Sequence, residues 1–289
     1  MTSSDPGIQA GQVEPNLAGL SDPADLTAYE RRMVALRTRE LERDPTLAAG
    51  NHDLDHLQRI HHYLLQDVYP WAGELRQHDT HAMGIEHCPP EHLSDVLNDI
   101  FARIAAEPPS RDDPAAALYT VAEHWSHTTW AHPFLDGNSR TQRVFFTDML
   151  HDAGFDIDWR AVDADAIHAA RHASFLTEDP SWLAAQLRPG LVHPGDTTPS
   201  LAVTDGLREN TRPLLIFTDM LEHHALGGDG ESYTHPDRPH PPSPHEHPQH
   251  DVEHEIQIHH QSPDPASRAH PTPPPIQSGP TPEPPHPTL

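Results

Sequence analysis

Apolar side chains recur at intervals of three and four through most of the first 190 residues, a spacing that places them on one face of an α-helix. Residues 75–90 break this spacing and predict a loop or a small hairpin. No stretch alternates apolar and polar residues for long enough to form a sheet. We therefore predict an all-α fold, with helices over residues 22–44, 53–66, 91–106, 113–132, 138–154, 163–176 and 180–188.

Aspartate and proline mark several of these helix ends. Asp22 precedes Pro23, so the carboxylate can accept bonds from the first free amides while proline stands where no donor is needed. The same pair opens the helix that begins at residues 113–114. Asp44 and Pro45 end the first helix, because the residue before a proline is pushed out of helical conformation.

The composition changes near Gly227, where Pro, His, Ser, Thr and acidic residues begin to dominate. Such a segment buries too little apolar surface to offset its conformational entropy, so we expect it to be disordered. The chain then divides into a flexible N-terminus (1–20), a folded domain (21–195), a C-terminal extension (196–226) and a disordered Pro/His-rich tail (227–289). Residues 214–221 form an apolar island that packs on the domain or binds a partner.

Charge and cysteine content limit the classes of function. The net charge is -26, and all 18 basic residues are arginine, which argues against direct binding to nucleic acid or to membranes. Cys88 is the sole cysteine, so no intrachain disulfide can form and a reducing compartment fits. No run of 18 apolar residues and no secretory signal is visible, so we expect a cytoplasmic protein.

Residues 132–143 read His-Pro-Phe-Leu-Asp-Gly-Asn-Ser-Arg-Thr-Gln-Arg. His132 ends a predicted helix, and histidine suits general-base work near neutral pH. Phe134 is expected to anchor the loop in the core. Asp136 offers a carboxylate beside the turn, which is a natural ligand for Mg²⁺ shared with phosphate oxygens.

The second half of the segment predicts an anion site. Gly137 and Asn138 turn the chain into a helix whose first amides have no partner, which favours phosphate. Arg140 and Arg143 lie three residues apart, so both are expected to face one side and to clamp phosphates. Each residue alone has an ordinary structural explanation, but this order and spacing favour phosphoryl or nucleotidyl transfer.

The segment resembles the signature of Fic domains, His-Pro-Phe-x-(Asp/Glu)-Gly-Asn-(Gly/Lys)-Arg-x-x-Arg. Residues 53–61 and 66–76 resemble the second helix of that family and the entry to its substrate-binding flap. The helix over 22–44 is similar to the N-terminal part of Fic toxins that are inhibited by a separate small protein. The resemblance covers roughly residues 16–192 and implies a Fic-type helical bundle with a small β-hairpin flap.

The resemblance also implies an activity, namely transfer of AMP from ATP to a hydroxyl side chain of a target protein. It implies that His132 deprotonates this hydroxyl and that Asp136 holds Mg²⁺ between the α- and β-phosphates. Asn138 and the amides around Gly137 and Ser139 would cradle the phosphates. Arg140 and Arg143 would neutralise the leaving pyrophosphate, and residues 77–87 would align the target segment by main-chain pairing.

The chain departs from the family pattern at a few positions. Ser139 stands where adenylylating members have Gly and a kinase-like subgroup has Lys; because Ser adds no charge, adenylylation is favoured over phosphorylation. Ala82 and His87 stand in the flap where Lys and Phe are common. His127 occupies a position that is often acidic.

Regulation and partners follow from the same resemblance. The sole Glu followed by Gly or Asn, as in the family's inhibitory motif, is Glu209 before Asn210, so inhibition is in cis, by a separate antitoxin, or absent. Related toxins act on type II topoisomerases, which makes these the first targets to test. The alternatives are a Fic-fold phosphotransferase and a catalytically silent binding module. Histidines of the tail would chelate Zn²⁺ or Ni²⁺ weakly, although a solvated extension is the simpler interpretation.

Overall fold

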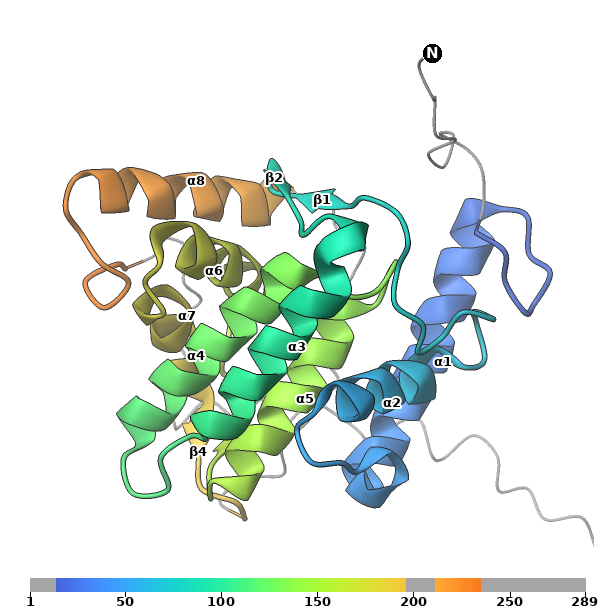
Figure 1. The fold of residues 1–289 in the computed structure, drawn as a ribbon, viewed down its shortest axis with the longest axis horizontal. Coiled ribbons are helices and arrows are strands. Elements are labelled where there is room, and N and C mark those ends of the chain that lie inside the picture. Colours follow the sequence, from blue (N-terminus) through green and yellow to red (C-terminus); the bar gives the residue numbers. More distant parts are fainter. Residues whose placement is uncertain (1–13, 196–210, 235–289) are drawn as a thin grey trace, which may run out of the picture. The chain divides into compact units, whose positions relative to one another are not determined.

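Helices dominate the computed structural model, which describes residues 14–195 and 211–234 (Figure 1). The elements in chain order are α1 (Pro23–Arg43), η1 (Pro45–Ala48), α2 (Leu54–Leu65), β1 (His81–Ala82), β2 (Ile85–Glu86), α3 (Pro90–Ala106), α4 (Pro114–Ala131), α5 (Asn138–Asp152), β3 (Asp156–Ile157), α6 (Ala164–Thr177), α7 (Ser181–Leu187), η2 (Arg188–Gly190), β4 (Leu191–Val192) and α8 (Thr211–Ala225). The helical prediction is confirmed. The hairpin within residues 75–90 is also confirmed, because β1 and β2 pair antiparallel.

Aspartate side chains explain why several helices begin where the sequence predicts. Asp22 accepts hydrogen bonds from the second and third amides of its helix, and Asp113 and Asp163 do the same for α4 and α6. Asp53 accepts from the amide of His56 at 2.8 Å. Each cap satisfies amides that the helix itself leaves without partners and contributes about 1 kcal/mol.

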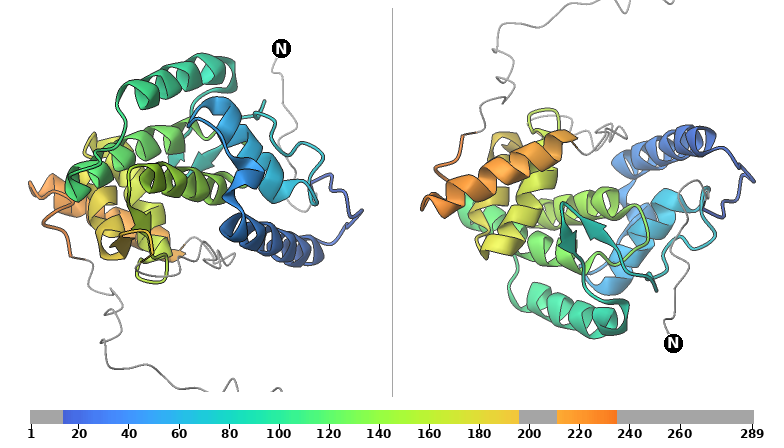
Figure 2. Two further views of the ribbon diagram at one scale, coloured as in Figure 1. Left: turned by 90° about the horizontal axis from the view of Figure 1, so that it is seen from below. Right: turned by 90° about the horizontal axis from the view of Figure 1, so that it is seen from above.

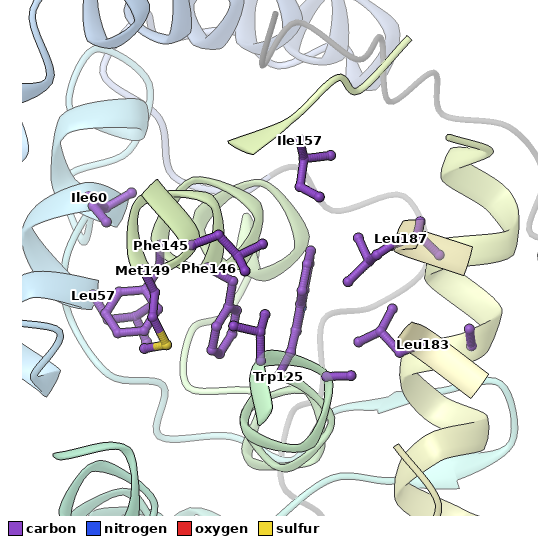
Figure 3. Close-up of a cluster of buried hydrophobic side chains, with 14 of the residues drawn as sticks. Leu57, Ile60, Trp125, Phe145, Phe146, Met149, Ile157, Leu183 and Leu187 are labelled. Carbon is purple, nitrogen blue, oxygen red and sulfur yellow. The ribbon is translucent and has the colours of Figure 1, made fainter. Parts of the chain in front are cut away.

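The hydrophobic core is centred on α4 and α5 (Figure 3). Trp125 of α4 stacks on Phe146 of α5 with ring centroids 5.1 Å apart. Helix α2 packs against α5, while α6 and α7 pack against α4. Burial of each such large side chain contributes about 1.5–3 kcal/mol. Labelled residues of this cluster are Leu57, Ile60, Trp125, Phe145, Phe146, Met149, Ile157, Leu183 and Leu187.

A buried polar side chain fixes how α4 and α5 align. The Gln142 Oε1 atom of α5 accepts hydrogen bonds from Trp125 Nε1 at 3.0 Å and from Thr129 Oγ1 at 3.1 Å. Its Nε2 atom donates to the Thr128 carbonyl at 3.1 Å. Buried polar groups left without partners are costly, so a shift of one helix along the other would lose all three bonds. Since residues 132–137 join these two helices, the network also fixes both ends of that loop.

Helix α8 contains the apolar island at 214–221, which the sequence did not predict to be helical. It lies along α6 (Figure 2), with Ile216, Phe217 and Met220 buried. Arg212 anchors its first turn through ion pairs with Asp163 at 2.5 Å and Asp165 at 2.7 Å. Of the two expectations for the island, packing on the domain is therefore the one observed.

The chain is folded somewhat beyond the limits drawn from composition. Before residue 21, the Leu17 amide donates to the Val68 carbonyl at 2.8 Å. After residue 226, the Gly230 amide donates to Ser181 Oγ at 2.9 Å, and the buried Tyr233 donates its hydroxyl to Asp219 at 2.7 Å. Leu17 of the N-terminus that we expected to be flexible, and Gly230 and Tyr233 of the tail that we expected to be disordered, thus contact the domain. Residues 1–13 and 235–289 lie outside the described residues.

Two short strands were not predicted. Asp156 of β3 pairs with Val192 of β4, and Ile157 pairs with Leu191, in an antiparallel arrangement. A strand of two residues shows no detectable alternation in sequence, so its pairing is settled by tertiary contacts alone. Among the described residues, no helix combines the length and apolar character needed to cross a membrane.

Candidate active site

The loop over residues 132–137 begins at the C-terminal end of α4, where Arg76 holds its backbone. The buried Arg76 guanidinium donates to the carbonyls of Ala131 at 3.0 Å, His132 at 2.6 Å and Cys88 at 2.5 Å. Its amide donates to the Pro133 carbonyl at 2.9 Å. One side chain thereby ties the β1–β2 hairpin region, which contains the predicted flap, to the first residues of the motif.

Asn138 and His61 hold the rest of the loop. The buried side-chain amide of Asn138 accepts a hydrogen bond from the Phe134 N–H at 3.0 Å and donates one to the Phe134 carbonyl at 2.6 Å. The fully buried ring of Phe134 stacks on His61 at a centroid distance of 3.8 Å, which confirms its predicted anchoring role. His61 accepts from the Gly73 amide at Nδ1 and therefore donates from Nε2 to the Asp136 carbonyl at 3.0 Å.

His132 has an unusual backbone and a covered side chain. Its φ of 46° lies in the left-handed region, which costs about 1–2 kcal/mol for a residue other than glycine. The ring stacks face to face on His87, with centroids 3.8 Å apart and 7° between the planes. Its Nδ1 atom is buried and meets no hydrogen-bond partner among the described residues. The histidine expected to act as the base is thus held rigidly beside the flap.

Burial and neighbouring basic groups keep His132 neutral. Desolvation lowers its pKa well below 6.5, and the nearby His87, Arg171, His172 and Arg76 lower it further. Burial also lowers the pKa of His87 to about 4. A neutral imidazole is the form that can accept a proton, so His132 is in the protonation state that a general base needs at neutral pH. The low pKa also makes it a weaker base than a free imidazole.

The N-terminus of α5 is open, in contrast to the aspartate-capped helices. The helix starts after Gly137, whose φ of 76° suits glycine, and no side chain of the described residues caps it. A Cβ atom at Gly137 would lie 2.5 Å from Leu65 Cδ1, so the end of this leucine side chain would have to move to make room for a larger residue. The first amides of α5, together with the helix dipole, therefore offer a site for an anion.

Asp136 lies between His132 and this helix start. Its carboxylate accepts from the Gly137 amide and from Arg140 at 3.3 Å, and its side chain remains 54 % exposed. One accessible carboxylate next to an anion site matches how proteins usually bind Mg²⁺, which keeps several waters and shares phosphate oxygens. The donor set at this position therefore fits the predicted metal.

The two arginines of the motif contact different elements. Arg140 pairs with Glu30 of α1, with Arg140 Nη1 and Glu30 Oε1 2.5 Å apart. The Tyr69 hydroxyl donates to the same carboxylate at 2.6 Å. Arg143 is buried and lies over the ring of Trp159, with its guanidinium carbon 5.1 Å from the ring centroid. The sequence predicted that both face one side, whereas here each has its own set of partners.

Comparison with known proteins places this loop in a family. A family model for Fic/DOC proteins matches residues 51–150. A probable protein adenylyltransferase, y4lH of Sinorhizobium fredii, is 31% identical over 175 residues, which cover 60% of this chain and 88% of the relative. The chain belongs to the Fic/DOC family. The probable protein adenylyltransferase Fic of Escherichia coli is 29% identical over 150 residues, which cover 52% of this chain and 72% of that protein.

The Fic fold is also found by comparison of structures. The N-terminal Fic domain of a VirB-translocated Bep effector protein from Bartonella quintana, crystallised with bound ADP, superposes with a TM-score of 0.55. The match covers 62% of this chain and 90% of that domain at 20% identity. The predicted Fic-type helical bundle is therefore confirmed.

Several residues that shape this Fic loop were not recognised from sequence. Arg76 and His61 belong to the blocks that resemble the family, but their spacing gives no sign of the backbone groups that they bind. Glu30 is one of many charged residues on α1, and His172 is one of 27 histidines. Only the folded chain brings these residues to the motif.

The structure shows where the unusual flap residues and His127 lie. His87 follows β2 and stacks on His132, whereas Ala82 lies in β1 opposite Ile85. His127 lies on α4 and lines a groove of about 520 Å³ that contains no residue of the 132–143 motif. Glu209 and Asn210 lie outside the described residues.

Proposed function

We propose that this Fic/DOC protein is a protein adenylyltransferase that moves AMP from ATP to a hydroxyl side chain of a target protein. The observation that carries the proposal is that one short loop holds a neutral histidine, an accessible carboxylate and an uncapped helix start. The names of the relatives support adenylyl transfer, and the ADP-bound Fic domain supports a nucleotide ligand.

In the proposed step, His132 accepts the proton of the target hydroxyl. The hydroxyl oxygen then forms a bond to the α-phosphorus of ATP, and the bond between this phosphorus and the bridging oxygen of the β-phosphate breaks. AMP remains on the target and pyrophosphate leaves. Residues at the start of α5, namely Asn138, Ser139 and Arg140, would bind the phosphates through their amides, which stabilises the charge of the leaving group.

Asp136 is the residue that would hold Mg²⁺, and the ion would supply charge neutralisation for the phosphates. Arg140 and Arg143 would add positive charge next to the pyrophosphate. For Arg140 to do so, phosphate must displace the Glu30 carboxylate, which lies 2.5 Å from the Arg140 guanidinium. The side chain of Asn138 fixes Phe134 and thereby the shape of the loop, whereas its backbone amide is the group that would face phosphate.

The proposal can be tested with ATP labelled at the α-phosphate and, in a separate reaction, at the γ-phosphate. Each is incubated with a bacterial lysate and wild-type protein, His132→Ala or His127→Ala. The last is a matched control, because His127 lies on the same helix but away from the motif. We expect α-label on protein with the wild type and His127→Ala and none with His132→Ala. Transfer of γ-label would indicate a phosphotransferase, and no transfer would indicate a silent binding module.

We further propose that the enzyme is a cytoplasmic toxin of a toxin–antitoxin pair and that type II topoisomerases are the first targets to test. The similarity of residues 22–44 to Fic toxins with a separate inhibitor supports this role. Expression should arrest growth in a His132-dependent manner. A small protein encoded by a neighbouring gene should relieve the arrest, and normal growth under strong expression would contradict the toxin role.

A further inference from the structure

Three side chains that could ligate a metal meet beside the C-terminal half of α5, beyond the end of the motif. His52 lies in the turn before α2, His56 lies on α2, and Asp148 lies on α5. Each of the three side chains offers one nitrogen or oxygen atom to a metal, and these three atoms lie within 4.8 Å of one another. Asp148 follows Asn138, at the proposed anion site, by ten residues, or about 15 Å along the helix, and it follows Arg143, the last residue of the motif, by five residues, or about 7.5 Å. The cluster is therefore separate from the proposed active site.

Both imidazoles converge on one oxygen atom. His52 Nε2 lies 3.1 Å and His56 Nε2 lies 3.9 Å from the same Oδ2 atom of Asp148. Ligand atoms of a tetrahedral Zn²⁺ site, with bonds of about 2.0–2.1 Å, are separated by about 3.3 Å. The first distance already matches that separation, and the second needs only a small rotation of a side chain.

The surroundings hold the rings in place. The His56 side chain is 2 % exposed and that of His52 is 16 % exposed. Phe145 packs against both rings, with centroids 5.6 Å from His52 and 5.3 Å from His56. Asp152 Oδ2 lies 3.9 Å from His52 Nδ1, which is within the range of an ion pair but too far for a hydrogen bond. His52 also has a φ of 55°, a strained conformation that turns its side chain toward α5.

We infer that His52, His56 and Asp148 form a site for a divalent transition metal, with Zn²⁺ as the best fit. Two imidazoles and one carboxylate are ligands that Zn²⁺ prefers, and water would complete a tetrahedral shell. Binding at His56 Nε2 would leave the ring proton on Nδ1. The long 3.3 Å bond that Nδ1 now accepts from the His52 amide would then be exchanged for the metal bond. The metal would cross-link the turn before α2 to α5.

The test uses the full chain and exploits the fact that only a site formed by folding raises the melting temperature. Histidines that bind metal equally in folded and unfolded protein leave the melting temperature unchanged. With Zn²⁺ at a hundredfold excess over its dissociation constant, the melting temperature should rise by about 5–10 °C, and a chelator should reverse the rise. His52→Ala and Asp148→Asn should abolish the rise. His92→Ala, which removes an exposed histidine of α3, should preserve it.

A second measurement locates the metal directly. Co²⁺ in place of Zn²⁺ should broaden the NMR signals of the Phe145 ring, which contacts both histidines, and Asp148→Asn should suppress this broadening. The Asn variant keeps the shape of the carboxylate, so a fold change is not expected and circular dichroism should match that of the wild type. The inference is overturned if Zn²⁺ does not stabilise the wild type. It is equally overturned if both site variants show the full rise.

Discussion

The ring of His87 covers the ring of His132 face to face at 3.8 Å, and the two side chains come from different parts of the chain. His132 directly follows the last residue of α4, and His87 follows the second strand of the flap. Thr80 Oγ1 lies 2.9 Å from His87 Nδ1 and fixes the ring from the other side of the hairpin. The flap thereby takes part in orienting the proposed base, in addition to any contact with a target protein.

Replacing His87 should separate the effect of the stack from that of the imidazole. His87→Phe keeps a flat ring over His132, so we expect a rate at pH 7 within about threefold of the wild type. His87→Ala removes the cover and lets water reach His132, so the rate should fall by about tenfold because the base is less well positioned. Initial rates of AMP transfer under saturating ATP give this comparison.

The pH profile distinguishes positioning from a general loss of structure. The pKa of His132 is held low mainly by burial, so the wild-type rate should stay constant from pH 8 down past 6.5 and fall only in more acidic solution. With His87→Ala, exposure to water should move this fall toward higher pH. Thr80→Val, which removes the bond to His87 but keeps the stack, is the control. A profile that is the same in all variants would refute the proposed role of His87.

Glu30 is expected to compete with the nucleotide for Arg140. Its carboxylate lies 2.5 Å from the guanidinium, and the two side chains are only 13 % and 21 % exposed. Glu30→Gln removes the charge that phosphate must displace, so the dissociation constant for a non-hydrolysable ATP analogue should fall by roughly three- to tenfold. Titration calorimetry measures this change.

The matched control for Glu30 is Glu40→Gln on the same helix. Glu40 pairs with Arg37 at 2.9 Å and has no contact with the motif among the described residues, so nucleotide affinity should not change. Weaker binding by Glu30→Gln would mean that the carboxylate positions Arg140 for phosphate, and the competition model would then be wrong.

The helices could be predicted because their signals are local. Asp22 and Asp113 stand next to prolines at helix starts, and the apolar spacing inside each helix reflects the face that it buries. Helix α8 also has apolar residues at helical spacing, but no aspartate–proline pair marks its start, and we did not predict it. In the structure, residues 211–225 are held by Arg212 and by burial against α6.

The candidate site likewise combines residues that the sequence can indicate with residues that only the fold reveals. His132, Asp136 and Arg140 could be proposed from the sequence because they lie in one short contiguous segment. Glu30 and Arg76 act on this segment across more than 50 residues of sequence, and their roles depend on which backbone or side-chain group they meet. No spacing rule connects such residues, so only the fold identifies them.

His61 should make stability depend on pH. Burial lowers its pKa to about 4, below the ordinary value of 6.5, and protonation of Nδ1 would also break the bond from the Gly73 amide. Between these pH values the unfolded chain binds the proton more readily than the folded chain, so stability falls as pH drops from 6.5 to 4. The difference between a pKa of 6.5 and one of about 4 corresponds to a loss of about 3 kcal/mol in the free energy of unfolding. Below pH 4 this contribution stays constant.

Urea unfolding at pH 7 and pH 4.5 measures the effect. His61→Asn places an acceptor near the position of Nδ1 but does not titrate in this range. The variant should be less stable than the wild type at pH 7 and should lose less stability on acidification. A histidine whose pKa is the same in the folded and the unfolded chain adds no pH dependence to the free energy of unfolding. The surface histidines therefore do not obscure the difference between the two proteins. Equal losses for both proteins would show that His61 does not carry this linkage.

Ser139, the second residue of α5, is the position where the family pattern is broken closest to the predicted phosphates. Two effects of the serine oppose each other: its Cβ atom crowds an anion that approaches the helix start, whereas its hydroxyl can donate a bond to that anion. Ser139→Gly removes both, and Ser139→Ala removes the hydroxyl alone.

We expect crowding to dominate, because the amides of the helix start already supply donors. Ser139→Gly should then lower the KM for ATP by about threefold and cost up to about 1 kcal/mol of stability. Ser139→Ala should leave KM unchanged. A similar rise of KM in both variants would instead assign the serine hydroxyl to phosphate binding.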